Sequence, residues 1–552
     1  MAVQARFRAR TAAIQHAFSS KDAFLSAMET KESATGQLAA RNRWSNEDLD
    51  ISPKKDWTWH WYDYAMFWWS YGFSTGVWSA GSSMIAIGLN WWQAIICVFI
   101  AHLLGAIGMV MHSRSAAVYH FGFPVSQRVP WGMIGAYFPV LVRVLVGTIW
   151  VGVQIAQGGF FTAVLLRAIF GHSFANLTSS IPKSSDITVQ QLIGVLLFWI
   201  LSLPLLAVPV PKIRFLYTAK SFILPPVVIG LFIFCILKDK SHAAGSFGKD
   251  PIKGSALAWV MLSGVNSLMG KTSTSIVNQP DLARYAATPN APFWSQLLAL
   301  PIGNTLCATL GIFATSAIKS AWGKTYWNPW DLCGAILDRY WSAGSRTGIA
   351  LVSMGFLLSI FASNLGVNVI PWGADTTLLL PRYVNIKRGM YISYILGLVI
   401  CPWKILVSAK SFLTFLGGYS IFLGPLVGIV LTDYLVVRKG NICIRDLYTA
   451  EKNARYWYTA GISWRAAFAY LLSVVWPIPG FTKSFGRDVP EGWVRVYQLG
   501  WLLTCVLSSV VYFAFCRIGN MGEEERKLGF EEMASNLFDE TAEEITVEEL
   551  KA

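Results

Sequence analysis

Long apolar runs separated by short polar loops make up most of the chain between residues 59 and 517. Each run has roughly 20 residues, enough for a helix that crosses a hydrocarbon core about 30 Å thick. The pattern predicts an all-α membrane protein of about twelve transmembrane helices. The predicted spans are 59–80, 91–112, 134–164, 190–209, 214–237, 256–277, 294–318, 349–372, 390–408, 411–436, 462–481 and 498–517.

Two of these spans contain small and polar residues that weaken a helix. The first holds Gly72-Phe73-Ser74-Thr75-Gly76, and the sixth holds Gly264-Val265-Asn266-Ser267 followed by residues 270–275. Transporters built from inverted repeats begin each repeat with a broken helix beside the substrate. We therefore expect both spans to be interrupted. Close helix packing through small residues is the alternative for either segment alone.

Composition and charge narrow the class of protein. Hydrophobic residues make up 54% of the chain and charged residues 14%, against about 25% charged residues in soluble proteins. The net charge of +14 is spread over loops and the N-terminal tail, without a basic helix or zinc spacing, which argues against nucleic-acid binding. No nucleophile–base pair or metal-ligand cluster stands out, so we expect a transporter and neither an enzyme nor a cofactor-binding protein.

The distribution of basic residues predicts the orientation. Positively charged loops face the cytoplasm, which predicts cytoplasmic termini. The basic residues of these loops are Arg114, Arg128, Lys212, Arg214, Arg382, Lys387, Arg388, Arg438, Lys439 and Arg445. Basic residues of predicted external loops, including Lys238, Lys240, Lys249 and Lys253, run against this pattern. The sequon Asn176-Leu177-Thr178 lies in a predicted external loop, where glycosylation is permitted.

Several polar residues inside the spans are candidates for a substrate site. Lys271 would cost about 2.5–3.5 kcal/mol at the centre of a membrane helix, so it should face a cavity or a partner; snorkelling to the span end is the alternative. Trp150 and Gln154 share a face one turn apart, where an indole can stack on a flat ring and an amide can bond its edge. Asn364 and Asn368 have the same spacing and either brace helices or contact a ligand.

Longer motifs resemble the fungal branch of nucleobase–cation symporter family one, which includes uracil, uridine and allantoin permeases and thiamine and nicotinamide riboside carriers. The resemblance covers about residues 42–517. Its motifs are Trp61-Tyr62-Asp63-Tyr64, Leu89-Asn90-Trp91-Trp92-Gln93, Asn278-Gln279-Pro280-Asp281-Leu282-Ala283-Arg284-Tyr285, Asn364-Leu365-Gly366-Val367-Asn368, residues 380–389 and Phe422-Leu423-Gly424-Pro425.

The resemblance implies a LeuT-like architecture of two five-helix inverted repeats plus two helices, operating by alternating access. It divides the chain into a cytoplasmic tail (1–57), a first repeat (58–238), a second repeat (239–437), two additional helices (438–517) and an acidic cytoplasmic tail (518–552). It implies that Trp150 stacks on the substrate, that Gln154, Asn368 and Lys271 contact it, and that Phe412 and Leu416 form an outer gate.

The same resemblance implies a cation site between the first and eighth spans, at Phe73, Gly76, Ser359, Ala362 and Ser363. Ala362 stands where a hydroxyl ligand would help bind sodium, which favours protons as the coupling ion. The function implied is import of a nucleobase or related planar heterocycle, such as uracil or allantoin, across the plasma membrane. A nucleoside or vitamin permease and a non-transporting nutrient sensor are the alternatives.

The tail residues Asn42-Arg43-Trp44-Ser45-Asn46-Glu47-Asp48-Leu49-Asp50 resemble a segment that family members fold against cytoplasmic loops. With the acidic C-terminal tail, this segment is a candidate contact for the ubiquitin and endocytic machinery. The other expected partners are the planar solute and membrane lipid.

Overall fold

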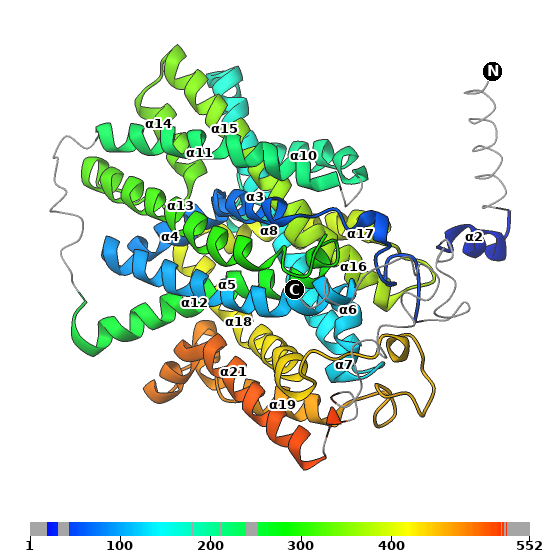
Figure 1. The fold of residues 1–552 in the computed structure, drawn as a ribbon. Helices are drawn as coiled ribbons and strands as arrows, with labels where there is room; N and C mark the ends of the chain where they lie inside the picture. Colours follow the sequence, from blue (N-terminus) through cyan, green and yellow to red (C-terminus); the bar gives the residue numbers. More distant parts are fainter. Residues whose placement is uncertain are drawn as a thin grey trace.

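The computed structural model describes residues 19–30, 44–178, 180–208, 212–238, 252–519, 521–523 and 526. These residues are almost entirely helical, with two isolated β-bridges, Trp59 to Ala286 and Thr459 to Ile462. Figure 1 shows the helices gathered into one body. Asn42, Arg43, Lys240, Lys249 and nearly all of the acidic C-terminal tail lie outside the described residues.

Each predicted span contains a helix. In chain order the helices are α3 (Trp61–Gly72) with α4 (Thr75–Ala86), α5 (Trp91–Tyr119), α8 (Tyr137–Phe170), α10 (Val189–Ser202), α11 (Ile213–Lys238), α12 (Gly254–Ala283), α13 (Phe293–Trp322), α15 (Ala343–Asn364) with α16 (Ile370–Leu379), α17 (Ile386–Val399), α18 (Ala409–Leu431), α19 (Trp464–Val474) with α20 (Ile478–Thr482), and α21 (Glu491–Ile518). The short helices α2 (Lys21–Met28), α6 (Phe123–Ser126), α7 (Arg128–Trp131), α9 (His172–Ala175) and α14 (Pro329–Arg339) lie outside the predicted spans.

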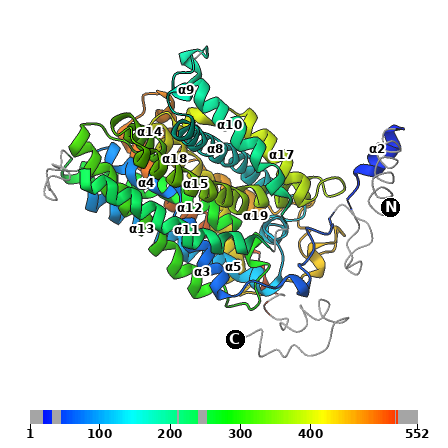
Figure 2. The ribbon, with the colours of Figure 1, turned by 90° about the horizontal axis from the view of Figure 1, so that it is seen from above.

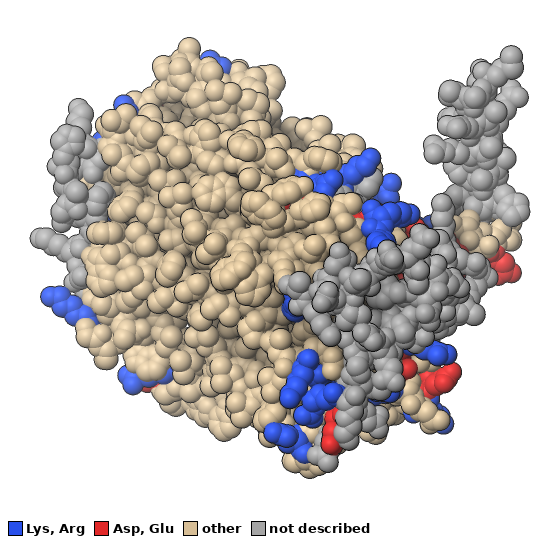
Figure 3. All heavy atoms as spheres, in the orientation of Figure 1, with Lys and Arg blue, Asp and Glu red and all other residues tan. Residues whose placement is uncertain are grey.

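The surface of this helical body suits a membrane. Among the described residues, eight helical segments are long and apolar enough to cross one. Figure 3 shows a broad area without charged side chains, with Lys and Arg gathered mainly at its right-hand end. The protein is therefore an integral membrane protein, and the count of twelve spans stays a prediction because α3–α4, α12, α17 and α19 are shorter or more polar.

The helices form two packed groups. The first group, which we name the bundle, contains α3, α4, α5, α12 and α13, and the second, the scaffold, contains α8, α10, α15, α16 and α17. Figure 2 shows α8, α10 and α17 side by side, apart from α3, α5 and α13. Helix α18 packs on α12 and, with α21, covers one side of the bundle.

The two ends of this body differ. We name the end that carries residues 44–60, α6, α7 and the segment 380–388 the tail face. The other end carries α9, α14 and the segment 401–408 and is named the opposite face. In Figure 1 α6 and α7 lie toward the right and α14 toward the upper left.

The first span is interrupted as predicted. Helix α3 ends at Gly72, Phe73 and Ser74 leave helical geometry, and α4 starts at Thr75. Gly72 is required at this break because a Cβ there would lie 2.6 Å from the Gly303 carbonyl carbon of α13. The freed carbonyl of Phe73 accepts a hydrogen bond from Ser359 Oγ at 3.0 Å, so the break faces the scaffold.

The prediction that the sixth span is interrupted was wrong, because α12 is continuous from Gly254 to Ala283. Its hydroxyls bond back to carbonyls of their own helix: Thr272 to Leu268, Ser273 to Gly270 and Thr274 to Lys271. Such bonds satisfy polar side chains without unwinding the backbone. Gly270 serves close packing, since a Cβ there would lie 2.0 Å from the Leu416 carbonyl oxygen.

Asn266 also has a different use from the one predicted. Helix α21 breaks at Gly500, whose φ of 25° and ψ of −102° are not helical. The Asn266 Oδ1 atom accepts the backbone N–H of Trp501 at 2.7 Å. The Asn266 amide thus caps the break in the neighbouring helix α21. The sequence pattern had instead predicted that Asn266 belongs to an unwound segment of its own span.

Candidate functional site

A small cavity marks the place where bundle, scaffold and α18 meet. It has a volume of about 20 Å³ and is lined by Trp150, Thr274, Asn368 and Leu423 among others. That volume is sufficient for about one water molecule. The helices are therefore closed around the predicted substrate position.

Trp150 comes from the middle of α8 and is held by α18. Its indole Nε1 donates to the Tyr419 hydroxyl at 3.0 Å, and its ring centroid lies 5.8 Å from that of Phe415. The side chain is buried, with 4% of its surface exposed. The fixed indole is thus available as a stacking surface inside the protein and does not face lipid.

Gln154 lies one turn farther along α8 and is also buried. Within the described residues, its Oε1 atom has no hydrogen-bond partner. A buried carbonyl oxygen without a partner costs free energy comparable to that of a lost hydrogen bond. An N–H group on a bound ligand would remove that cost.

Asn364 immediately precedes a π-helical turn, Leu365–Val369, and Asn368 lies within that turn. Asn368 Nδ2 donates to Asn364 Oδ1 at 3.0 Å, and Asn364 Nδ2 donates to the Val151 carbonyl at 3.3 Å. Asn278 Nδ2 bonds the Val367 carbonyl inside the turn at 2.5 Å. The structure therefore brings Asn368 to the cavity beside Trp150 and places Asn364 behind it as a brace. Single π turns of this kind are frequent at functional sites.

Lys271 lies against the start of α4. Its Nζ is 5.1 Å from the centroid of the Tyr71 ring, and its Cε is 3.5 Å from the position of a Cβ at Gly76. Nζ is buried and has no hydrogen-bond partner in the described part of the chain. Lys271 does not line the small cavity, but Thr274, one turn away on the same helix, does. It is buried and does not snorkel.

The predicted gate residues pack tightly in α18, and their closure of the site toward the opposite face stays a prediction. The Phe412 ring lies 5.6 Å from the ring of Trp327, centroid to centroid, at an angle of 30°. Both Phe412 and Leu416 are fully buried. Close packing of α18 on Gly270 of α12 supports the same closure.

Protein donors already occupy the predicted cation site. Ser359 bonds the Phe73 carbonyl, and the Tyr217 hydroxyl donates to the Ala362 carbonyl at 2.6 Å. Lys220 Nζ donates to Ser363 Oγ at 2.7 Å from a fully buried position in α11. Sequence reasoning missed Lys220, although a lone lysine inside the fifth span is the same signal that selected Lys271.

A buried charge cluster at the wall of the small cavity was also missed. Arg143 of α8 bonds Asp281 of α12 at 2.7 Å and Asp375 of α16 at 2.5 Å. The guanidinium also lies 3.8 Å from the Phe123 ring centroid. Because Asp281 belongs to the bundle and Arg143 to the scaffold, this ion pair closes the site toward the tail face.

Residues 44–50, the described part of the segment that the resemblance named, pack on the tail face together with residues 51–57. Arg284 donates to the Ser52 hydroxyl and to the carbonyls of Asp48 and Asp50 at 2.5–2.8 Å. The Asp48 carboxylate accepts the Ile386 N–H at the start of α17 at 2.7 Å. The segment thus touches the end of α12 in the bundle and the start of α17 in the scaffold.

Comparison with solved structures identifies the fold. The structure superposes on Mhp1, a nucleobase-cation-symport-1 family transporter in a closed conformation with bromovinylhydantoin bound, with a TM-score of 0.67 over 90% of this chain and 100% of that one. The inward-facing conformation of Mhp1 gives a TM-score of 0.66. At 19% and 18% sequence identity, these matches show the LeuT-like fold alone.

Comparison of the sequence identifies the protein family. Residues 52–504 match the family model described as "Permease for cytosine/purines, uracil, thiamine, allantoin", and the chain belongs to this family. It is 33% identical to the allantoin permease of Saccharomyces cerevisiae over 85% of this chain and 75% of that protein. It is 34% identical to the uridine permease of the same yeast, over 85% of this chain and 74% of that protein. The protein is a permease and not an enzyme.

Proposed function

We propose that the protein imports a nucleobase or a related planar heterocycle, of the uracil or allantoin kind, by alternating access coupled to protons. The observation that carries this proposal is the buried, unpaired Gln154 Oε1 one turn from the fixed Trp150 indole. A planar ring with N–H and C=O groups on its edge can stack on the indole and satisfy this amide. Asn368 supplies further hydrogen-bonding atoms at the small cavity, which Trp150 also lines. Gln154 lies one turn along α8 from Trp150 and is not among the lining residues.

The names of the relatives support this substrate class. Allantoin, uridine and uracil permeases of Saccharomyces cerevisiae are 33%, 34% and 32% identical to the chain. The uridine permease makes a nucleoside the second candidate, since its similarity equals that of the allantoin and uracil permeases. The closed cavity of about 20 Å³ holds neither a base nor a nucleoside, so either solute needs the gate to open.

Lys220 supports protons as the coupling ion. Its ammonium group places a positive charge beside Ser363, where the resemblance implies a cation. If Lys220 loses and regains a proton in each transport cycle, the charge beside Ser363 changes. In a sodium-coupled transporter, binding and release of the ion would make the same change.

Two contacts support alternating access. The Phe412–Trp327 contact closes the site toward the opposite face, and the Arg143–Asp281 ion pair closes it toward the tail face. Separation of one pair while the other holds would expose the cavity to one side at a time. The bundle moving against the scaffold would break Arg143–Asp281 and leave Arg143–Asp375 intact, because Arg143 and Asp375 both belong to the scaffold.

We further propose that the protein lies in the plasma membrane with its tail face in the cytoplasm. Arg128, Arg382, Arg388 and Arg438 lie on this face, as the preference for positive cytoplasmic loops requires. The packed segment 44–57 is then a candidate contact for the ubiquitin and endocytic machinery when it leaves the loops. Unchanged substrate-driven turnover after deletion of residues 42–50 would argue against that role.

Uptake of radiolabelled uracil, allantoin and uridine by a host without its own permeases tests the proposed function. We expect saturable uptake of at least one of the three that an uncoupler abolishes. Signalling without uptake would indicate a nutrient sensor, and uptake that follows a sodium gradient would exclude proton coupling.

A further inference from the structure

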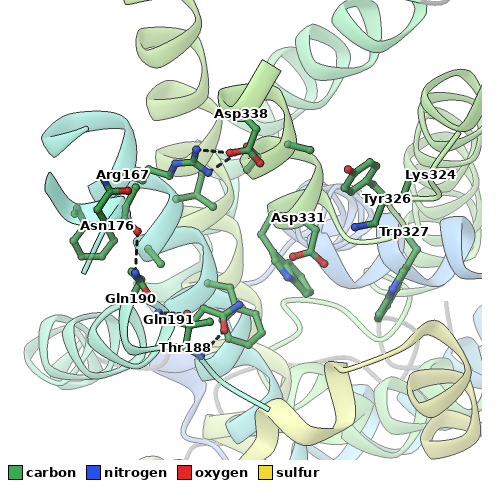
Figure 4. A pocket seen from close by; sticks show the side chains of 18 of the residues that line it. Arg167, Asn176, Thr188, Gln190, Gln191, Lys324, Tyr326, Trp327, Asp331 and Asp338 are labelled. Atoms are coloured by element: carbon green, nitrogen blue, oxygen red, sulfur yellow. Dashed lines mark hydrogen bonds and ion pairs between the residues drawn. The ribbon is translucent and has the colours of Figure 1, made fainter. Parts of the chain in front are cut away.

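A second, much larger cavity opens beyond the gate. It has a volume of about 770 Å³, inside the range of roughly 300–1,000 Å³ that small-molecule sites occupy. One wall comes from the end of α8, the segment around Asn176 and the start of α10, and the other from residues 324–327 and α14. Figure 4 shows Arg167, Asn176, Thr188, Gln190 and Gln191 on the first side, and Lys324, Tyr326 and Trp327 on the second.

Trp327 connects this cavity with the gate. Trp327 lines the large cavity. Its ring also contacts the ring of Phe412, one of the two predicted gate residues. The neighbouring Trp330 also lines the cavity and is held by Phe160, with ring centroids 5.6 Å apart. Two fixed indoles thus give the cavity aromatic surface directly outside the closed gate.

The charges around the cavity balance. Among its described lining residues, Arg167 and Lys324 are basic, and Asp331 and Asp338 are acidic. Arg167 and Asp338 pair at 2.5 Å, and they close one end in Figure 4. A balanced lining with aromatic surface suits a neutral polar ring better than an ion.

Asp331 supplies the polar group that a ring would contact. It lies in the first turn of α14, and its Oδ2 accepts from Asn328 Nδ2 at 3.2 Å. In Figure 4 its side chain lies between the Gln190–Gln191 side and the Tyr326–Trp327 side. The Asp331 side chain is exposed to the cavity, and partial loss of water within the cavity raises its pKa above the usual value, although Asn328 and Lys324 favour the charged form.

We propose that this cavity is a second binding site for a neutral planar heterocycle with adjacent N–H and C=O groups. The ring lies on the indoles of Trp327 and Trp330, and a ring N–H donates to the Asp331 carboxylate. The site holds the solute outside the closed gate before Phe412 leaves Trp327. This inference rests on the proposed function, because it takes the same class of solute.

Equilibrium binding to the purified full-length protein in lipid nanodiscs tests the second site. The probes are radiolabelled uracil, allantoin and uridine, each titrated separately. The variants are Asp331→Asn, which keeps an acceptor for Asn328, and Gln154→Ala, which removes the central amide. Asp186→Asn is the matched control, because Asp186 is an exposed aspartate near α10 that does not line the cavity.

We expect two classes of site in the wild type for the probe that binds. Gln154→Ala should keep the weaker class, and Asp331→Asn should keep the stronger class while weakening the other about tenfold, the loss of one charge-assisted hydrogen bond. Asp186→Asn should bind as the wild type does. A single class that Gln154→Ala removes completely, with an unchanged isotherm in Asp331→Asn, would overturn the second site alone. Absence of binding by every probe to the wild type would overturn the proposed function as well.

Discussion

Lys220 and Ser363 join the fifth span to the eighth through a hydrogen bond of 2.7 Å. Ser359, one turn before Ser363 on α15, bonds the Phe73 carbonyl at the break in the first span. The lysine therefore lies beside the freed backbone that marks ion sites in transporters of this architecture. Its position links the charge state of one amine to the contact between bundle and scaffold.

Replacement of Lys220 by methionine should remove the proton dependence of uptake. Methionine fills a similar volume without a titratable group, so the charge beside Ser363 would no longer change. Initial uptake rates measured at acidic and alkaline external pH, with and without an uncoupler, check this expectation. Lys319→Met is the control, since Lys319 is an exposed lysine on the neighbouring helix α13. A Lys220→Met variant with the pH profile of the wild type would exclude Lys220 as the coupling group.

Gln154→Ala and Asn368→Ala should each weaken substrate binding at least about tenfold, which corresponds to about 1.4 kcal/mol. The Gln154 oxygen has no partner in the substrate-free protein, so its removal should leave the amount of protein in the membrane unchanged. Binding measured beside surface fluorescence of a tagged protein checks both statements.

Gln157→Ala is the contrasting variant on the same helix. Gln157 Oε1 accepts the Thr75 hydroxyl at 2.9 Å, so its removal should loosen the start of α4 and reduce the surface level. Normal uptake kinetics in both Gln154→Ala and Asn368→Ala would refute the proposed site.

Lys271→Ala should impair transport. The Lys271 ammonium is buried beside the break in the first span without a hydrogen-bond partner in the described residues, and an unpaired buried charge lowers stability. We therefore also expect Lys271→Met, which keeps the volume, to raise the melting temperature while uptake falls. A Lys271→Met variant with full uptake would show that the charge has no role in transport.

The sequence located the break in the first span but misplaced one in the sixth, and the difference has a physical cause. Both segments combine glycines with hydroxyl residues. In the first span Gly72 packs onto Gly303, and the Phe73 carbonyl finds a donor in Ser359. In α12 the hydroxyls of Thr272 and Ser273 find acceptors in their own helix. Residue types alone do not distinguish these partners.

Neighbouring side chains of one helix could be selected from the sequence, and partners that are distant in the chain could not. Trp150 and Gln154 share a face of α8, so their spacing alone indicated a site. Arg143 pairs with Asp281 and Asp375, which are 138 and 232 positions away. The packing of α8 against α12 and α16 creates this cluster, and no local pattern around Arg143 indicates it.

Asp281→Asn should open the site toward the tail face. It removes the ion pair between bundle and scaffold, whereas Asp375→Asn leaves that pair intact and serves as the control. Thr274→Cys, at the wall of the small cavity, reports access when its labelling by an impermeant thiol reagent is measured in inside-out vesicles. We expect faster labelling of Thr274→Cys with Asp281→Asn than with Asp375→Asn. Equal rates in the two backgrounds would show that the Arg143–Asp281 pair does not close the site.

Acidification at the tail face should release the segment 44–57 from the loops. The Trp57 ring stacks on His120 with centroids 3.5 Å apart, and His120 Nδ1 bonds the Arg284 carbonyl at 3.0 Å. Burial lowers the pKa of His120 from 6.5 to about 4, and the nearby Arg284 cation acts in the same direction. Because the docked segment favours neutral His120, its docking is fully stable above pH 6.5 and weakens as the pH falls toward about 4.

Fluorescence anisotropy of a label at Lys54→Cys, an exposed position in this segment, measures the release. We expect the anisotropy to fall as the pH on the tail face is lowered through this range. His120→Asn is the matched variant, because asparagine tolerates the left-handed φ of 56° at this position and its amide can donate to the Arg284 carbonyl without titrating. The pH dependence should disappear in His120→Asn, and its persistence there would assign the release to another group, such as the half-buried carboxyl of Asp48.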